Sequence, residues 1–511
     1  MRAKEPAPGG GRHVAAALVA LGAAGASMVV YRSILGAYFW SDDFTWLYLL
    51  HDRSLAEFLL TPMGGHSLVA RNAVFALTDA AVGFDPRPYF ATMLATHGLN
   101  VALLAGLIWR LTGRLTLAGI GALAWGICPS ASETLAWYSV FGQVAATACI
   151  LLALHRVAPR ACDGEVPSSR DTAIAGAWLM LSSLFFGTAL AVALVWPLFM
   201  VLLVPGIVSD RRRIAGIVGA SAAVWGLYAL LQGLASRLYA APMVPLGMVK
   251  WLLESPSRAA ITFLQLVRVG VASLCLGASW HPAPQSDTVS WLVLLGAAGG
   301  WTSALVVAPS RQRRTMLGFL LLALAVYALL AVARGPISAT LMGKSGAAVA
   351  ATPRYHYAAQ AFLVVSLCAA IDAVAGRLRS FAFIPLLAWG CALVAAIIVR
   401  GIDVERHETM PAEVTRMLAA LRAQVALARP GETVYVANMP VPGFGWMPNS
   451  VEYPPGLAAL FIITSRSDEI EGRPVRFVAS DPASGEPRRG SRTARLLVSP
   501  ASAPTAGAGA P

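Results

Sequence analysis

The stretch RQRRTMLGFLLLALAVYALLAVAR, residues 311–334, decides the fold class. Its arginines precede an uncharged apolar run, 315–333, which as a helix is about 28 Å long. That length matches the roughly 30 Å hydrocarbon core of a bilayer. Similar runs recur from residue 14 to about residue 400, and the chain is 57% hydrophobic with only 13% charged residues. Globular domains carry about 25% charge. A soluble enzyme, a disordered chain and a secreted disulfide scaffold are therefore excluded, and we predict an all-α polytopic membrane protein.

The apolar segments predict about 11 transmembrane helices. They cover residues 14–36, 89–110, 115–129, 134–155, 172–190, 191–208, 214–234, 289–308, 315–333, 356–374 and 381–400. On this count every short arginine-rich connection falls on one side, which the positive-inside rule assigns to the cytoplasm. These connections carry Arg110, Arg114, Arg156, Arg160, Arg170, Arg211, Arg212, Arg213, Arg311, Arg313, Arg314, Arg377 and Arg379.

The formal charge of +13 is explained by the same connections. Many of the arginines stand in short clusters between apolar runs, which is typical of topology signals rather than of a nucleic-acid surface. We therefore expect no nucleic-acid partner. The six cysteines mostly lie inside apolar runs and show no CxxC spacing, so we interpret them as small hydrophobic residues and predict no metal site.

The N-terminal region predicts a retained membrane anchor. Arg2, Lys4 and Arg12 precede the long run 14–31, and no small-x-small cleavage site follows it. With the span count, this places the N-terminus in the cytoplasm and the C-terminus outside it. The high ratio of arginine to lysine and the lack of an N-x-[ST] site favour the plasma (inner) membrane of a bacterium over the endoplasmic reticulum.

Two larger segments are predicted outside the cytoplasm. Within a membrane module of residues 1–400, the first outer loop is 37–88. Residues 401–480 combine a helix-period stretch (411–428), a strand (433–438), a Pro/Gly-rich loop (439–456) and a second strand (473–479), which suffices for a small α/β cap. The tail 481–511 is expected to be disordered. The apolar segment 259–278 contains Arg268 and breaks the span count, so we expect an interfacial or re-entrant helix there.

An acidic pair, Asp42 and Asp43, follows the first span in FWSDDFTWLYLLHD (39–52). A carboxylate at the membrane surface is costly unless it has a purpose. One interpretation is a helix start, in which Ser41 or Asp42 is the cap and the acidic first turn complements the helix dipole. The other is catalysis. Adjacent helical residues point about 100° apart, so only one of the two could act as a base on a given atom.

Further polar residues line the predicted outer ends of the first four spans. His66 and Arg71 lie in GGHSLVARN (64–72), His97 and Asn100 share one face of the second span, and Glu133 lies near the start of the fourth. Contact with a substrate is one interpretation of these residues. Hydrogen bonding between helices is the alternative, and for His97, Asn100 and Glu133 it is the favoured one.

The order of these elements resembles the GT-C superfamily of integral-membrane glycosyltransferases. The acidic pair is followed by H-x4-R (66–71), G-x-D-P-x-P-Y (83–89), H-x-x-N (97–100) and P-x3-E-x3-W (129–137). The match is closest to the protein O-mannosyltransferase-like and tetratricopeptide-bearing mannosyltransferase branch, although no tetratricopeptide repeat is visible. It covers residues 35–155, and the rest of the chain only through hydropathy. The resemblance implies a GT-C-like fold, an acidic residue acting in the first outer loop, and a polyprenyl-phosphate-sugar donor bound from outside.

A second element of this kind is TPRYHYAAQAFL (352–363). Relatives often have R-Y-x-Y followed by proline here, whereas this chain has Ala358. Arg354 breaks the inward bias of the arginines, so contact with the lipid phosphate is one interpretation of Arg354 and Tyr355. An interfacial anchor is the other. Lys344 is a further candidate cation.

If the resemblance holds, the chain transfers a sugar from the polyprenyl-phosphate-linked donor to an acceptor hydroxyl by inverting single displacement. Asp42 or Asp43 would be the base. Arg354, Arg71, His66 and Lys344 are the cations expected at the phosphate. The acceptor is open (protein, lipid or glycan), and membrane lipids are partners. The sequence assigns no cofactor and leaves open whether a divalent cation assists. The alternatives are a transporter or flippase, or a polymerase or ligase, of lipid-linked saccharides. A transporter would need charges at mid-membrane and usually two related halves.

Overall fold

The computed structural model describes residues 10–40, 42–63, 65–239, 244–277, 284–340 and 346–378, and short pieces between 388 and 497. The chain forms two compact units. Unit 1 comprises residues 1–35, 59–136 and 140–403, and unit 2 comprises residues 36–58, 137–139 and 404–511. The sequence predicted that all of 37–88 would belong with the membrane module, whereas 36–58 belongs to unit 2.

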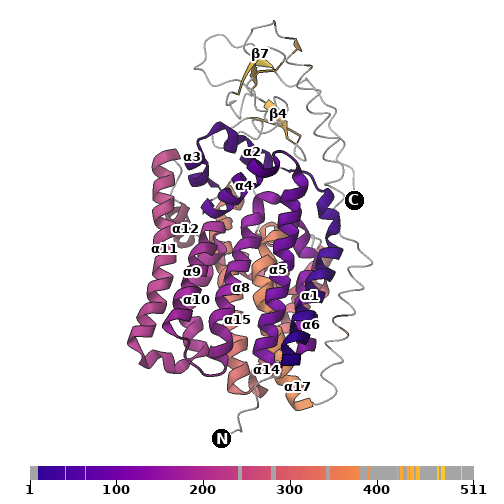
Figure 1. Ribbon diagram of the computed structural model, residues 1–511, viewed down its shortest axis with the longest axis vertical. Coiled ribbons are helices and arrows are strands. Elements are labelled where there is room, and N and C mark those ends of the chain that lie inside the picture. Colours follow the sequence, from indigo (N-terminus) through magenta and orange to yellow (C-terminus); the bar gives the residue numbers. More distant parts are fainter. Residues whose placement is uncertain are drawn as a thin grey trace. The chain divides into compact units, whose positions relative to one another are not determined.

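Unit 1 is built of long helices that run roughly side by side (Figure 1). They are α1 (Gly10–Val30), α4 (Val69–Val82), α5 (Pro86–Thr112), α6 (Leu115–Gly126), α8 (Phe141–Cys162), α9 (Ser169–Phe185), α10 (Thr188–Leu203), α11 (Arg211–Tyr239), α12 (Val244–Glu254), α13 (Pro256–Leu276), α14 (Pro284–Val307), α15 (Ser310–Thr340) and α17 (Tyr357–Leu378). A helix occupies each of the first ten predicted spans. The eleventh, 381–400, lies outside the described residues apart from two positions.

Short elements connect these helices. They are the 3-10 turns η1 (Arg32–Gly36), η2 (Pro129–Ala131), η3 (Tyr138–Val140), η4 (Pro205–Ser209) and η5 (Pro353–His356), the helices α7 (Ser132–Leu135) and α16 (Gly346–Ala350), and the hairpin of β1 (Pro62–Met63) with β2 (His66–Ser67).

Eight helical segments in the described part of the chain are long and apolar enough to cross a membrane. A ninth is possible if α6 and the bent η2–α7 segment, which meet at 48°, form one broken span. Helices α9 and α10, with 17 and 16 residues, fall below that length. The segment expected at the interface forms α13 and meets the criterion. The predicted eleven crossings and this count of nine therefore differ at α9, α10 and α13, and at the segment 381–400, which lies almost wholly outside the described residues.

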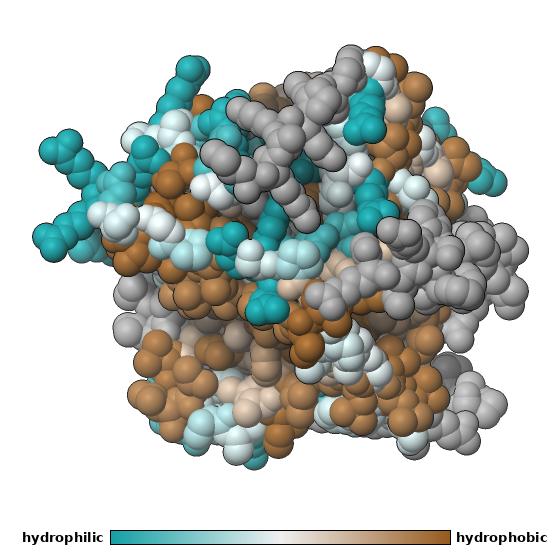
Figure 2. Space-filling view, turned by 90° about the horizontal axis from the view of Figure 1, so that it is seen from below, coloured by the Kyte–Doolittle hydropathy of each residue, from teal (hydrophilic) through white to brown (hydrophobic). Residues whose placement is uncertain are grey.

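The arginine-bearing connections lie together at one end of unit 1. The contacts that join them are Arg311 to the Asp163 carboxylate (2.8 Å) and to the Leu111 carbonyl (3.4 Å), Arg213 to the Pro167 carbonyl (3.2 Å), and Arg114 and Gln312 to the Asp372 carboxylate. The predicted span count requires all the arginine-rich connections to lie on the same side of the membrane, and these contacts agree with that requirement. Figure 2 views unit 1 from below and shows hydrophilic side chains projecting beside apolar surface.

Local sequence explains where the helices begin and approach one another. Asp85 caps α5 by accepting a hydrogen bond from the Arg87 amide, Pro86 follows at the first helical position, and Gly113 ends the helix with φ of 72°. Between α6 and α17, a Cβ atom at Gly121 would lie 2.6 Å from the Cys368 sulfur. Glycine at position 121 therefore permits these two helices to pack closely.

Unit 2 contains α2 (Asp42–Asp52), most of α3 (Leu55–Leu60) and two small sheets. One sheet has the order β6 (Glu469–Ile470), β7 (Arg473–Phe477), β3 (Val434–Val436), β8 (Leu496–Leu497). Strand β3 is parallel to β7 and to β8, and β6 is antiparallel to β7. The strands predicted over 433–438 and 473–479 are confirmed. The predicted helix 411–428 and apolar run 457–463 lie almost wholly outside the described residues.

Strands also form within two segments of the C-terminal region where the sequence predicted none. The predicted loop 439–456 contains most of an antiparallel hairpin of β4 (Asn438–Val441) and β5 (Gly445–Pro448). The predicted disordered tail 481–511 contains β8, in which two leucines pair with β3. Such pairing depends on a partner strand distant in sequence, which local composition does not reveal.

Candidate functional site

Asp43 holds the start of α2 in place. It is fully buried, and its carboxylate accepts hydrogen bonds from the backbone amide of Trp40 (3.0 Å) and from both the amide and the hydroxyl of Ser139. Edge-to-face packing of Trp40 on Trp137, with ring centroids 4.9 Å apart, strengthens the same junction. The Asp43 carboxylate therefore stabilises the start of α2, where the first interpretation expected Ser41 or Asp42 as the cap. Asp42, the other member of the pair, is partly exposed in the first turn of α2.

In unit 1, Arg354 and Glu133 form an ion pair between η5 and α7. The Arg354 amide also lies 3.4 Å from the Glu133 carboxylate, and the Arg354 carbonyl accepts a hydrogen bond from Gln143 at 2.6 Å. About a quarter of each charged side chain remains exposed, 22% for Arg354 and 27% for Glu133. The sequence analysis treated the two residues separately, with substrate contact as one interpretation of each and hydrogen bonding between helices favoured for Glu133. The structure brings the two residues together.

Two arginines flank the ring of Tyr355. The guanidinium of Arg354 lies 5.1 Å from the ring centroid, and that of Arg334, near the end of α15, lies 5.9 Å from it. Both distances are within the range of cation–π attraction, which holds guanidinium groups on aromatic faces. Arg334 was missed in the sequence because it directly follows an apolar run. Arg334 lies at the predicted outer end of a span. Like Arg354, it is therefore an exception to the rule that arginines lie on the cytoplasmic side.

His66 accepts a hydrogen bond from Arg334. The distance from the Arg334 Nη2 to the His66 Nε2 is 2.7 Å, and the imidazole stacks on Phe186 with centroids 4.3 Å apart. Gly187 permits this stacking, because a Cβ there would lie 2.8 Å from the His66 Nδ1. Burial of the ring, and secondly the charge of Arg334, lower the pKa of His66 well below its usual value. The lowered pKa favours the neutral imidazole, so Arg334 and Arg354, rather than His66, carry the positive charge near Tyr355.

The β1–β2 hairpin that carries His66 is fastened to α11. The Tyr228 hydroxyl and, at 3.4 Å, the Gln232 amide donate to the Gly65 carbonyl. Gln232 also donates to the Ser67 hydroxyl at 2.9 Å. These bonds fix the backbone on both sides of His66, so the imidazole presents its acceptor nitrogen to Arg334 in a set position.

A pH-dependent stability follows from the neutral His66. Unfolded histidine takes up a proton below about pH 6.5, whereas folded His66 resists protonation because it is buried beside Arg334. The contribution of His66 to the free energy of unfolding is therefore complete above about pH 6.5. It declines, by up to about 1.4 kcal/mol per pH unit, as the pH falls toward the lower pKa of the folded state. A His66→Gln variant keeps an acceptor and lacks the titration. Thermal unfolding of both proteins at pH 5, 6, 7 and 8 measures the difference, and parallel pH profiles would contradict the assignment.

His97 and Asn100 belong to a closed network between helices. The Tyr357 hydroxyl contacts the His97 Nδ1 (2.7 Å) and accepts from the Asn100 amide (3.2 Å), while the His97 Nε2 contacts the Gly126 carbonyl and the Ser27 hydroxyl, both at 2.9 Å. Since a carbonyl only accepts, the Nε2 carries the proton and the Nδ1 accepts from Tyr357. Both predicted residues are fully buried. Their placement corresponds to the interhelical bonding that the sequence favoured, not to an open binding surface.

Removing the Tyr357 hydroxyl tests this network. Tyr357→Phe leaves the His97 Nδ1 without its donor and weakens one Asn100 contact, so we expect a loss of about 1–3 kcal/mol of unfolding free energy. The measurement is the unfolding midpoint in detergent. Tyr355→Phe is the matched control, because the Tyr355 ring contacts two guanidinium groups and its loss of a hydroxyl is expected to leave the midpoint unchanged. Equal midpoints for the two variants would refute the network's role.

Two further predicted cations are Arg71 and Lys344. Arg71 is 1% exposed, donates to the Asn72 side chain at 3.0 Å and lies 5.0 Å from the Phe75 ring centroid. Its placement indicates a structural role within α4. Lys344 lies outside the described residues.

The cluster of Arg334, Arg354, Tyr355, Glu133 and His66, which we call the arginine cluster, lies far from the arginine-bearing connections. Arg334 follows Arg311 on α15 by 23 residues, which is about 34 Å along the helix axis. Within the cluster, two guanidinium groups, one carboxylate and a neutral imidazole leave one net positive charge. Among the described residues no carboxylate pairs with Arg334. A partly exposed site of this kind suits a phosphate group.

The chain matches no protein-family model. No curated protein matches it either. Among solved structures, it is similar to the crystal structure of ArnT from Cupriavidus metallidurans bound to undecaprenyl phosphate. The identity is 12%, the alignment covers 89% of this chain and 85% of that chain, and the TM-score is 0.35.

Proposed function

We propose that this chain is a membrane glycosyltransferase of the GT-C type. It transfers a sugar from a polyprenyl-phosphate-linked donor to an acceptor hydroxyl on the extracytoplasmic side, by inverting single displacement. The observation that carries the proposal is the pair of arginines on Tyr355, at the opposite end of α15 from the arginine-bearing connections. By the positive-inside rule that end is the outer one.

The charge of the arginine cluster suits the donor. A polyprenyl-phosphate sugar is a phosphodiester with one negative charge, and the cluster has one net positive charge. Arginine presents planar donors that match two phosphate oxygens. Arg334, which donates to the neutral His66, keeps donors for such an oxygen because a guanidinium has five N–H groups. Apolar helix surfaces would accommodate the prenyl chain.

The charge on the phosphate grows during transfer. As the bond from the sugar carbon to the phosphate oxygen breaks, the electron pair stays on that oxygen, and the released monoester carries about −1.5 to −2 at pH 7. Arg354 then exchanges part of its contact with Glu133 for the new charge. Contacts that strengthen in the transition state lower the barrier more than contacts made equally in the ground state.

Asp42 is the residue that we propose as the base. The acceptor oxygen forms the new bond to the sugar carbon as its proton passes to the Asp42 carboxylate. Asp43 is the weaker candidate because its carboxylate already accepts hydrogen bonds from Trp40 and Ser139. Attack from the face opposite the phosphate predicts inversion at the sugar carbon.

The proposal is tested with the purified chain and a panel of polyprenyl-phosphate monosaccharides, with a membrane extract as the source of acceptors. Release of polyprenyl phosphate with one of these donors is expected. Movement of the intact donor across a vesicle membrane without release would instead support the flippase alternative. Products carrying many sugars would support a polymerase or ligase.

A further inference from the structure

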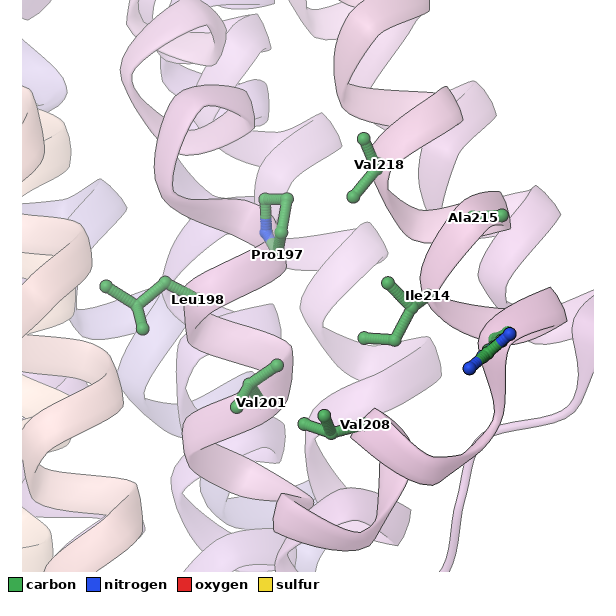
Figure 3. A pocket seen from close by; sticks show the side chains of 8 residues that line it. Pro197, Leu198, Val201, Val208, Ile214, Ala215 and Val218 are labelled. Carbon is green, nitrogen blue, oxygen red and sulfur yellow. The ribbon is translucent and has the colours of Figure 1, made fainter.

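An apolar groove runs between α10 and α11, at the end of unit 1 where α11 begins. It has a volume of about 580 Å³ and is lined by Pro197, Leu198, Val201, Val208, Arg211, Ile214, Ala215 and Val218. Figure 3 shows Pro197 and Val201 on one helix facing Ile214 and Val218 on the other, with Val208 below. Arg211 is the one charged residue of this lining.

The sequence explains why the two helices leave this space. Pro197 lies inside α10, where its missing amide and its ring disturb the regular helix. On α11, Arg211, Ala215 and Val218 fall at spacings of four and three residues and so share one face. Small and β-branched side chains on that face leave the groove unfilled. Leu198, Val208 and Val218 are 51%, 58% and 47% exposed, which is costly in water and suits hydrocarbon.

The charge at the groove's end is positive. Arg211 begins α11, directly followed by Arg212 and Arg213. Arg213 is paired with Asp210 at 2.9 Å and donates to a backbone carbonyl. Among the described residues no carboxylate pairs with Arg211. Three guanidinium groups and one carboxylate leave two net positive charges here, so an anion is favoured at the mouth of the groove.

The groove is separate from the arginine cluster. Tyr228, which holds the His66 hairpin, lies 17 residues beyond Arg211 on α11, or about 26 Å along the axis. A lipid phosphate at Arg211 therefore cannot be the one contacted by Arg334. The apolar walls and the terminal arginine together match a lipid with an anionic head.

We propose that this groove is a binding site for one anionic membrane phospholipid. One acyl chain lies between Val201 and Val218, and the phosphate contacts the Arg211 guanidinium. This site is independent of the proposed sugar transfer. Because arginines near an anionic membrane surface each contribute about 1 kcal/mol, phosphatidylglycerol binds more tightly than phosphatidylcholine of the same chain length.

The charge is tested by native mass spectrometry of the purified full chain with phosphatidylglycerol or phosphatidylcholine. Arg211→Gln is expected to weaken phosphatidylglycerol binding about fivefold. Arg212→Gln is the matched control: it removes the same charge from the neighbouring residue, which does not line the groove, and less than a twofold effect is expected. Equal losses in the two variants would show that charge acts diffusely and would overturn the site. Equal binding of the two lipids by the wild type would overturn it too.

The groove itself is tested by filling it. Ala215→Phe is expected to lower phosphatidylglycerol occupancy, whereas Ala223→Phe, at an exposed position of α11 outside the groove, is not. Unchanged occupancy in a folded Ala215→Phe variant contradicts the proposal. If that variant does not fold, the comparison of Arg211→Gln with Arg212→Gln decides, since both residues are exposed. Polyprenyl phosphate displacing phosphatidylglycerol in the wild type, but not in Arg211→Gln, would assign the groove to the donor lipid and overturn the phospholipid assignment.

Discussion

Replacing Asp42 by asparagine is expected to slow sugar transfer by about 10²–10⁴-fold, which is the usual contribution of a general base. Asparagine has nearly the same shape and cannot take the acceptor's proton. The apparent KM for the lipid donor is expected to stay within a factor of about two, because the proposed phosphate contacts, Arg334 and Arg354, are unchanged. The measurement is the initial rate of polyprenyl phosphate release as donor concentration varies.

Asp43→Asn is the control for this prediction, since it removes the neighbouring charge. An asparagine has one acceptor oxygen where the carboxylate has two, so hydrogen bonds from Trp40 or Ser139 are lost. We expect about 1–3 kcal/mol of lost stability, seen as a lower unfolding midpoint. Because Asp42 is partly exposed whereas Asp43 is fully buried, Asp42→Asn is expected to lower the midpoint less than Asp43→Asn. If Asp42→Asn were active, and Asp43→Asn lost activity at an unchanged midpoint, Asp43 rather than Asp42 would be the base.

Replacing Arg334 by glutamine is expected to raise the apparent KM for the polyprenyl-phosphate donor by about 10–100-fold. This range corresponds to the loss of hydrogen bonds between charged groups. Lysine keeps the positive charge but lacks the planar guanidinium group. The apparent KM of Arg334→Lys is therefore expected to lie between those of the wild type and Arg334→Gln. Donor dependence of the initial rate is the measurement.

Arg314→Gln provides the matched control for Arg334. Arg314 lies on the same helix, in its first turn, and donates to the Ser310 carbonyl at 3.2 Å. Its replacement removes one charge from α15 without touching the arginine cluster, so donor dependence is expected to stay at the wild-type value. A normal KM in Arg334→Gln, or an equal rise in both variants, would refute phosphate binding by the cluster.

Hydropathy predicted the helical part of the fold because a membrane span must be both apolar and long. Ten predicted segments coincide with helices, and the arginine-rich connections contact one another through Arg311, Arg213 and Arg114. The ends of the helices were harder to predict. The fourth predicted span, 134–155, begins before α8 because the short elements α7 and η3 interrupt the apolar run.

The candidate site was predictable only in part. Sequence position singled out Arg354 and Glu133 separately, but their pairing joins residues 221 positions apart. Arg334 could have been predicted as well, because it follows the predicted outer end of the span 315–333, where an arginine is an exception to the positive-inside rule. The neutrality of His66 had no signal in the sequence. It arises from burial and from the Arg334 guanidinium, which come from other parts of the fold.

The Tyr357 network has a thermodynamic consequence for ligand capture. Tyr357 stands three residues after Arg354, and its hydroxyl is bonded to His97 and Asn100 on α5. Its backbone carbonyl also accepts a hydrogen bond from the Trp125 indole at 3.0 Å. The backbone beneath the Arg354 guanidinium is therefore ordered before any anion arrives. Little conformational entropy remains to be lost on association, so most of the attraction between guanidinium and phosphate appears as affinity.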